Sequence, residues 1–259
     1  GHPGMIDSRI SIMQPIVMKE IRWFLRAVCH NCGAPTITMK KKGLKKVPQP
    51  INIKKDEEKF CSNCGVELYR VLQKHVDEPV FIMVQTTKDK KDIRILYPDD
   101  IKKIFEMITD ETMRILQKNV NVHPRKYIIS KIRVIPVSAR PCVKALGTSG
   151  STSYHDITNI IQTMVKSNNY IPHDVDLHST ADEVRKVART LQKALYDLII
   201  GTPIAQGSSS VMKKGAMVNS HFIKSIFQRI QSKEGRIRIN LIGKRAWWMA
   251  RSVISVDVS

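Results

Sequence analysis

Long apolar runs are missing from this chain of 259 residues. No segment reaches about 18 consecutive apolar residues, the length that indicates a membrane-spanning helix. The first residues, GHPGMIDS, also lack the cationic stretch followed by an apolar stretch that marks a secretory signal. We therefore expect no membrane span, no signal peptide and an intracellular protein.

Acidic residues are scarce. The 43 Lys and Arg outnumber the 23 Asp and Glu, which gives a formal net charge of +20. Such an excess indicates a polyanionic partner, with nucleic acid first and an acidic membrane surface second. The length allows a sizeable core and one or two domains. Because the chain begins at Gly1 and ends at Ser259 without an initiator methionine, we expect it to be a piece of a longer polypeptide.

Cysteines are also few, and their spacing is informative. Four of the five form two C-x-x-C pairs, and one is left over: Cys29 with Cys32, Cys61 with Cys64, and Cys142. An odd count with paired spacing and no signal peptide favours a reducing compartment and metal binding over disulfides.

The two pairs have the spacing of a zinc ribbon. Each C-x-x-C would form a knuckle, and two knuckles would surround Zn²⁺ with a tetrahedron of thiolates. Gly33 and Gly65 directly follow the pairs and would allow tight turns that point N–H groups at sulfur. Four thiolates leave no open position, so we expect structural zinc; reduced thiols, disulfides or an iron–sulfur centre are the alternatives. His30 would be a fifth ligand, and we expect it to be exposed.

The N-terminal half shows several local signals. Residues 15–28 have helical apolar spacing after Pro15. Residues 36–60 are rich in Lys, and we interpret them as a solvated loop, with direct DNA contact as the alternative. Residues 80–85 and 93–97 are typical of strands around a turn at 86–92.

A helix should begin at Pro98, where early acidic residues suit a helix N-terminus. Its predicted apolar face comprises Ile101, Ile104, Phe105 and Ile108. The segment 132–141 alternates and is interrupted by Pro, which predicts an extended stretch. Residues 147–153 and 201–217 are rich in Gly and Ser and predict loops.

Two helices within 156–200 are expected to pack as an antiparallel pair with residues 168–178 as its tip. Asp156 should cap the first, and Ser179 or Thr180 should form a capping box for the second. The apolar stripe of the second helix comprises Val184, Val187, Ala188, Leu191, Ala194, Leu195 and Leu198.

The strongest basic cluster lies in residues 211–251. It contains ten Lys or Arg and one acidic residue, Glu234. A solvated face would intersperse acidic residues to relieve repulsion, so this composition favours phosphate contacts, for which the Arg fork is well suited. The cations are Lys213, Lys214, Lys224, Arg229, Lys233, Arg236, Arg238, Lys244, Arg245 and Arg251.

The segment 233–254, KEGRIRINLIGKRAWWMARSVI, closely resembles the segment that leads into the catalytic core of the largest subunit of multisubunit DNA-directed RNA polymerases. The resemblance extends along the chain through the Cys pairs, PDDIKKIF at 98–105 and IPVSARP at 135–141. Two segments, CHNCGAP at 29–35 and RPCVKALGTSGSTSYHDITNIIQ at 140–162, are more similar to subunits of large DNA viruses, of the African swine fever virus type, than to cellular subunits.

This resemblance implies an α+β fold: a polymerase clamp with a structural zinc ribbon and an antiparallel helical hairpin. It implies three parts: a clamp head and core at 1–142, a lid-like loop, hairpin and rudder-like loop at 143–217, and a template-binding segment at 218–259. The implied function is to hold template DNA and the RNA–DNA hybrid during transcription. The implied partners are the other polymerase subunits, notably the second-largest, and transcription factors at the hairpin.

Carried over by the resemblance, the expected phosphate contacts are Lys233, Arg236, Arg238, Lys244, Arg245 and Arg251. Trp247 and Trp248 are interpreted as packing residues. In the family a second zinc site precedes the first, and His2 resembles its last ligand; taken alone, His2 is a terminal histidine. The chain departs from the family at Ile239, where Gly is usual, and near Trp247 and Trp248, where an acidic residue followed by an aromatic is usual. It departs again at 257–259, which read Asp-Val-Ser where Asp-Pro-Asn is usual.

The family's Asp-Phe-Asp-Gly-Asp motif, whose carboxylates bind the catalytic Mg²⁺, does not occur here. We therefore expect Mg²⁺ only in the full subunit and no nucleotide addition by this piece alone. The compartment would be a virus factory in the host cytoplasm, or the host nucleus, with packaging in the virion as a further option. The alternative function is a stand-alone zinc-ribbon nucleic-acid-binding protein.

Overall fold

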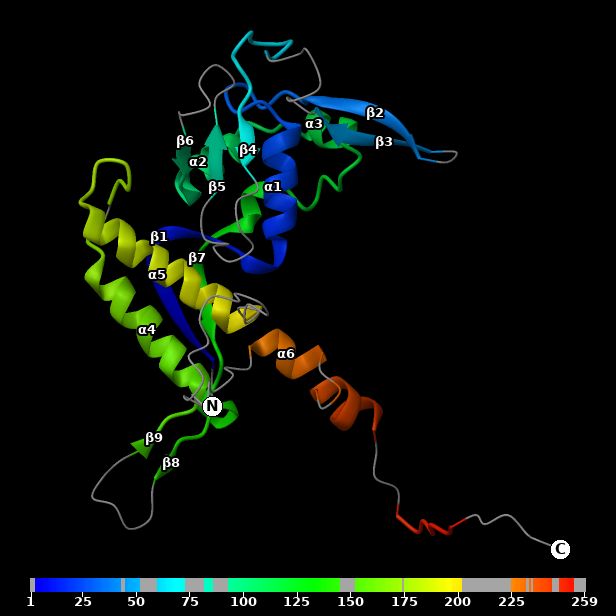
Figure 1. Ribbon diagram of the computed structural model, residues 1–259, viewed down its shortest axis with the longest axis vertical. Helices are drawn as coiled ribbons and strands as arrows, with labels where there is room; N and C mark the ends of the chain where they lie inside the picture. Colours follow the sequence, from blue (N-terminus) through cyan, green and yellow to red (C-terminus); the bar gives the residue numbers. More distant parts are fainter. Residues whose placement is uncertain are drawn as a thin grey trace, which may run out of the picture.

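The computed structural model describes residues 3–42, 45–51, 60–72, 82–85, 93–144, 152–173, 175–201, 225–231, 233, 235–243 and 247–253. Helices alternate with small antiparallel sheets, as expected for a mixed α and β fold (Figure 1). In this described part, no helix is both long and apolar enough to cross a membrane.

A long antiparallel ribbon joins the two main packing units. It pairs β1 (Gly4–Met13) with β7 (Ile128–Val134), and the register shifts between Asp7 and Ile12. Of the extended stretch predicted at 132–141, only residues 132–134 belong to a strand, which begins earlier than expected, and the 3-10 turn Val137–Ala139 lies within the rest. The ribbon packs on both units because its residues enter two separate cores.

The first unit packs α1 (Met18–Ala27), α2 (Pro98–Glu106) and α3 (Asp110–Ile115) around one core. The 3-10 turn Pro15–Val17 leads into α1, so the predicted helix is confirmed. The turn Pro124–Tyr127 leads into β7. The core comprises Met13, Met18, Ile21, Phe24, Leu25, Ala27, Val28, Ile82, Val84, Ile101, Ile104, Phe105, Ile108, Met113, Leu116 and Ile128, which includes the whole predicted face of α2.

A three-stranded sheet in the order β4 (Arg70–Leu72), β5 (Ile82–Gln85), β6 (Ile93–Leu96) lies beside this core. The predicted strand pair is confirmed, with Ile82 opposite Leu96 and Gln85 opposite Ile93. The predicted turn at 86–92 lies outside the described residues.

Part of the Lys-rich segment 36–60 is not the loop that its composition predicted. Strand β2 (Ile37–Lys42) pairs with strand β3 (Lys45–Pro50), and we call this pair the β2–β3 ribbon. Residues 43–44 and 52–59 of the predicted loop lie outside the described residues. Pro48 and Pro50 are two residues apart, so their missing N–H groups lie on the same edge of β3, which is how a two-stranded ribbon tolerates proline. Figure 1 shows the β2–β3 ribbon extending beyond the helices of the first unit.

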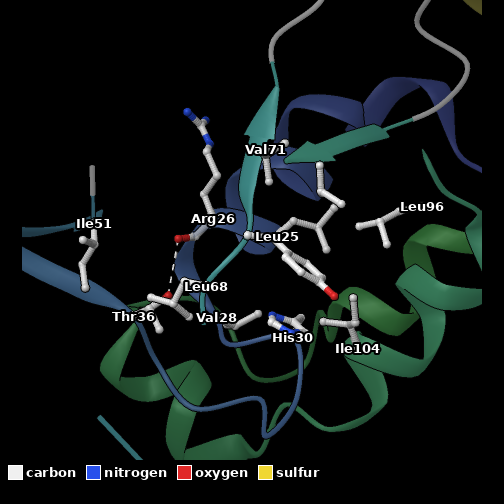
Figure 2. A pocket seen from close by; sticks show the side chains of 12 residues that line it. Leu25, Arg26, Val28, His30, Thr36, Ile51, Leu68, Val71, Leu96 and Ile104 are labelled. Atoms are coloured by element: carbon white, nitrogen blue, oxygen red, sulfur yellow. Dashed lines mark hydrogen bonds between the residues drawn. The ribbon is translucent and has the colours of Figure 1, made fainter. Parts of the chain in front are cut away.

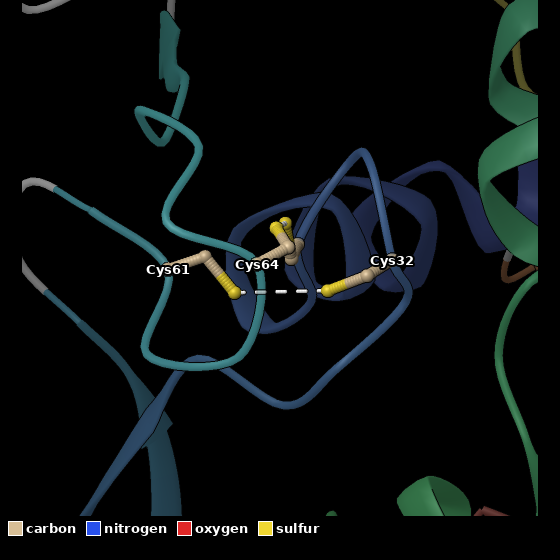
Figure 3. Close-up of side chains that lie close together, drawn as sticks. Cys32, Cys61 and Cys64 are labelled. Atoms are coloured by element: carbon tan, nitrogen blue, oxygen red, sulfur yellow. Dashed lines mark hydrogen bonds between the residues drawn. The ribbon is translucent and has the colours of Figure 1, made fainter.

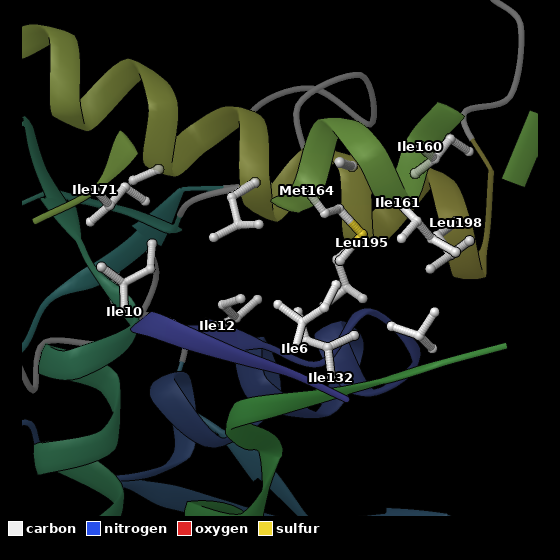
Figure 4. Close-up of a cluster of buried hydrophobic side chains, with 14 of the residues drawn as sticks. Ile6, Ile10, Ile12, Ile132, Ile160, Ile161, Met164, Ile171, Leu195 and Leu198 are labelled. Carbon is white, nitrogen blue, oxygen red and sulfur yellow. The ribbon is translucent and has the colours of Figure 1, made fainter. Parts of the chain in front are cut away.

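The second unit packs α4 (Asp156–Tyr170) and α5 (Asp182–Ile199) on the β1–β7 ribbon. Figure 1 shows the two helices side by side and running in opposite directions. The predicted stripe of α5 faces this core, which Figure 4 shows between the helices and β1. A short pair, β8 (Val143–Lys144) with β9 (Thr152–Ser153), precedes α4.

The predicted caps of both helices are wrong. His155 caps α4, because its Nδ1 accepts the N–H of Ile157 at 3.2 Å, and Asp156 is already helical. Ala181 precedes α5 without a side-chain cap. The Thr180 hydroxyl instead donates to the carbonyl of Asp176, so no capping box forms.

The connector between α4 and α5 is attached to the rest of the fold. The Arg9 guanidinium donates to the carbonyl of Ile171 at 2.6 Å. His178 Nε2 lies 2.8 Å from Asp100 Oδ2 at the start of α2, and its ring meets Tyr97 edge-on. The predicted tip is thus held against β1 and α2.

The C-terminal part extends away from both units (Figure 1). It contains α6 (Ile226–Gln231) and a π-helical turn (Ile237–Ile242). Ser225 Oγ donates to the carbonyl of Ile200 at 2.8 Å, which joins this part to the end of α5. Within the predicted loop at 201–217, only Gly201 is described.

Candidate metal centre and nucleic-acid interface

The four paired cysteines meet at one point (Figure 3). Cys29 Sγ lies 3.6 Å from Cys64 Sγ, and Cys32 Sγ lies 3.7 Å from Cys61 Sγ. All four sulfur atoms lie within 4.8 Å of one another. A zinc tetrahedron with bonds of about 2.3 Å has sulfur–sulfur edges of about 3.8 Å. The cluster therefore fits a metal such as zinc, and Cys142 is separate and exposed.

The two knuckles are built alike. In the first, which follows α1, the Cys29 N–H donates to Ala34 O at 2.8 Å and the Gly33 N–H donates to Cys29 O at 3.0 Å. In the second knuckle, the Cys61 N–H donates to Val66 O and the Gly65 N–H donates to Cys61 O, each at 2.8 Å. The N–H groups of the two glycines themselves bond carbonyls. The prediction that the tight turns point backbone N–H groups at sulfur is confirmed. Asn31 N–H is the group that approaches Cys29 Sγ, at 3.5 Å.

Both glycines have a φ of +68°, a left-handed conformation that other residues rarely adopt. They differ in their surroundings. A Cβ at Gly33 would lie 2.4 Å from the carbonyl oxygen of Met107, whereas a Cβ at Gly65 would meet no atom within 4 Å. Gly33 therefore also allows the first knuckle to pack against the end of α2.

Two thiols of the cluster differ in acidity. Burial raises the pKa of Cys29 to about 12, against a partial lowering by backbone N–H groups. The backbone N–H of Val66 is the main cause that lowers the pKa of Cys64 to about 6. A metal binds thiolates rather than thiols, so a cation at this point would offset the cost of a buried charge at Cys29.

His30 is half-buried, so the prediction that it is exposed is wrong. Its ring stacks on Tyr69, with centroids 3.8 Å apart and planes at 13°, and burial lowers its pKa. Both residues line a cavity of about 20 Å³ beside α1 and β4. Figure 2 shows His30 at this cavity. Sequence reasoning missed Tyr69 because no motif links it to the first knuckle.

The predicted phosphate contacts lie in the C-terminal part. Lys233, Arg236, Arg238 and Arg251 are exposed, and Arg236 Nη1 donates to Asn240 Oδ1 at 3.2 Å. Lys244, Arg245 and the candidate ligand His2 lie outside the described residues.

The interpretation of the tryptophan pair as packing residues is wrong for this structure. Trp247 is 89% exposed and Trp248 is 102% exposed. The flanking apolar residues predicted burial, but burial requires a facing surface, and none of the described segments supplies one.

A mixed α and β fold, a cluster of four cysteines and a strongly cationic chain define a protein suited to metal and nucleic-acid binding. Residues 1–241 match the family described as RNA polymerase Rpb1, domain 1, so the chain belongs to that family. The expected resemblance to the largest subunit is thereby confirmed.

Relatives of the chain include DNA-directed RNA polymerase subunits of a virus and of an archaeon. The chain is 32% identical over 265 residues to the DNA-directed RNA polymerase RPB1 homolog of an African swine fever virus isolate from Kenya, covering 98% of this chain and 18% of the relative. It is 26% identical over 277 residues to the RNA polymerase subunit Rpo1N of Methanocaldococcus jannaschii, covering 99% of this chain and 19% of the relative. The chain therefore spans only a minor share of the length of these relatives.

Proposed function

We propose that this chain is the N-terminal clamp part of the largest subunit of a viral DNA-directed RNA polymerase. Family membership over residues 1–241 carries this proposal and favours it over a stand-alone zinc-ribbon protein. The clamp would hold template DNA and the RNA–DNA hybrid. Nucleotide addition and its Mg²⁺ would require the rest of the subunit, because the family's acidic motif does not occur in this sequence.

The four-cysteine cluster would hold structural zinc. The donor set supports this role, because four thiolates complete a tetrahedron and leave no position for water or substrate. Zinc would join the end of α1 to the second knuckle and so stabilise the first unit. His2 would belong to a second zinc site whose other ligands this sequence does not contain.

The helix pair α4–α5 would serve as the clamp hairpin and bind transcription factors, while other polymerase subunits, notably the second-largest, would complete the cleft. Residues 1–142, 143–217 and 218–259 would act as the head and core, the hairpin with its lid-like and rudder-like loops, and the template segment. The compartment would be that of viral transcription in the infected cell, either cytoplasmic factory or nucleus, or the virion.

The template contacts would be Lys233, Arg236, Arg238, Lys244, Arg245 and Arg251. The exposure of the four described members supports this role. They would bind phosphates without reading bases, because phosphate contacts position a protein but carry no sequence information.

The salt dependence of DNA binding tests the proposal. Each phosphate contact contributes about 0.9 to the slope of log K against log salt on duplex DNA, so replacing Lys233, Arg238, Arg245 and Arg251 with Ala should lower the slope by roughly three to four. A control that replaces the exposed Lys19, Lys102, Lys103 and Lys166 should lower it far less. Equal slopes in the parent and the first variant would contradict the assignment.

A further inference from the structure

The outer half of the β2–β3 ribbon concentrates positive charge on both strands. It carries five lysines: Lys40, Lys41, Lys42, Lys45 and Lys46. The register places Lys41 opposite Lys46 and Lys42 opposite Lys45. Residues 36–51 contain no Asp or Glu. Like charges directly opposite each other destabilise an antiparallel pair. The two Lys–Lys pairs therefore lower the stability of the isolated ribbon.

The base of the β2–β3 ribbon is nevertheless firmly attached. The Thr36 N–H donates to Ala27 O at 2.7 Å, and the Ile51 N–H donates to Thr36 O at 3.2 Å, so both strands start from the end of α1. Thr36 is buried. Along β3, the Gln117 amide donates to Lys46 O at 3.3 Å. These contacts hold the ribbon in one direction, beyond the helices (Figure 1).

Described side chains far from the base of the β2–β3 ribbon are more exposed than most of those near its base, as expected for an interaction surface. Lys40 and Lys46 are exposed, whereas Thr36 and Pro48 nearer the base are buried. The ribbon therefore packs on the first unit through its base, and its two lysines with a described side chain, Lys40 on β2 and Lys46 on β3, are both exposed. A solvated loop, which the composition alone favoured, would need neither this pairing nor these attachments.

We propose that the β2–β3 ribbon is a second contact surface for duplex DNA, separate from the basic segment 211–251. A two-stranded ribbon fits the major groove of B-form DNA, which is about 12 Å wide. Lys40 on β2 and Lys46 on β3, whose side chains are exposed, would then reach the phosphates that border the groove. The ribbon would bind without base specificity, since Lys acts as a point charge on phosphate. The inference extends the proposed function and rests on it only in that the chain works on DNA.

The test compares two variants of the full chain with equal loss of charge. The ribbon variant replaces the five ribbon lysines with Gln. The control variant replaces five exposed lysines on helices with Gln: Lys19, Lys102, Lys103, Lys166 and Lys186. We expect the ribbon variant to lower the salt slope on duplex DNA by about 2 or more, at about 0.9 per phosphate contact, and the control variant to lower it much less. Equal losses in both variants would overturn the proposal, because only general charge would then matter.

Two further arms separate groove binding from other causes. Duplex RNA has a deep, narrow major groove, so the ribbon variant should change RNA affinity much less than DNA affinity; equal losses would overturn the groove geometry. Replacing the five lysines with Arg keeps the charge and should preserve the DNA slope; a lowered slope at unchanged thermal stability would show that ribbon charge does not carry the binding and would overturn the proposal.

The failure of this inference is distinguishable from that of the proposed function. The variant with Ala at Lys233, Arg238, Arg245 and Arg251 provides the comparison. If it loses DNA affinity while the ribbon variant binds like the parent, the ribbon proposal fails and the proposed role of residues 218–259 in template binding is retained. If the parent chain binds no DNA, the DNA-binding part of the proposed function fails, and the ribbon proposal fails with it.

Discussion

The side-chain amide of Gln192 on α5 makes two hydrogen bonds to the backbone of Met13 in β1. The Met13 N–H donates to Gln192 Oε1 at 2.9 Å, and Gln192 Nε2 donates to Met13 O at 2.8 Å. Asn168 on α4 does the same for the Arg9 N–H and Asp7 O, each at 2.9 Å. The two helices thus give β1 the bonds that a third strand would supply, which satisfies its buried backbone groups.

Replacing Gln192 with Leu should lower the free energy of unfolding by about 2–4 kcal/mol, because it leaves a buried donor and acceptor of Met13 without partners. The measurement is urea unfolding followed by circular dichroism. Gln162→Leu, at an exposed position of α4, should stay within about 0.5 kcal/mol of the parent. The same transition midpoint for the two variants would show that the bonds to Met13 contribute little.

Gly33→Ala should be more damaging than Gly65→Ala. Both substitutions place a side chain in a left-handed conformation, but only the first brings Cβ to 2.4 Å from a backbone oxygen. Overpacking of this kind costs about 1–3 kcal/mol. Thermal unfolding should therefore occur at a lower temperature for Gly33→Ala, and equal melting of the two variants would argue against close packing of the knuckle on α2.

Cys61→Ser should abolish stoichiometric metal binding and unfold the two knuckles. Structural zinc contributes on the order of 10–16 kcal/mol, so its loss exceeds the stability of a small unit. Elemental analysis of the purified parent should find about one zinc per chain. Cys142→Ser, at an exposed cysteine, is the control and should retain the metal. A parent with less than about half an equivalent of zinc would contradict structural zinc.

Leu191→Asp should separate α4 from α5. Leu191 is fully buried in the second core, and a charge there has no partner among the core residues, so the cost should exceed about 4 kcal/mol. The neighbouring Thr190 is exposed, and Thr190→Asp adds the same charge to solvent. Circular dichroism and melting should change for the first variant only; unchanged melting of Leu191→Asp would refute the packing of this face.

Tyr127 should link stability to alkaline pH. Burial, and then the carboxylate of Glu20, raise the pKa of Tyr127 above its ordinary value of 10.0. The folded state therefore favours the neutral phenol, and this contribution is present below pH 10 and lost as pH rises through the raised pKa. Tyr127→Phe should flatten the alkaline loss of stability, and Glu20→Gln should lower the pKa of Tyr127 in an ultraviolet titration. A tyrosinate titration that Glu20→Gln leaves unchanged would exclude the role of that carboxylate.

The sequence predicted those features that depend on residues close together in the chain. The stripe of α5 and the face of α2 could be predicted because helical periodicity and burial of one side are both written in consecutive residues. The metal cluster could be predicted because two C-x-x-C pairs leave little freedom in how their sulfur atoms meet.

The predictions that were wrong include those for the β2–β3 ribbon, His30 and the cap of α4. For the first two, the structure depends on contacts with residues far away in the chain. Lys and Pro are depleted in strands, so the β2–β3 ribbon was not expected; its attachment to Ala27 and Gln117 does not show in its own sequence. His30 is half-buried because Tyr69, far along the chain, stacks on it. The cap of α4 was assigned to Asp156 because Asp is a common cap, whereas His155 has the required extended backbone.

The bonds between Met13 and Gln192 also impose an order on folding during synthesis. Their partners are 179 residues apart, so β1 must wait for α5 to emerge from the ribosome before its backbone is satisfied. At about 5–20 residues per second, that delay lasts roughly 10–40 s. The cysteines, α1, α2 and α3 are all made within that interval. The first unit should therefore fold early, while β1 remains a strand with an open edge until the helix pair arrives.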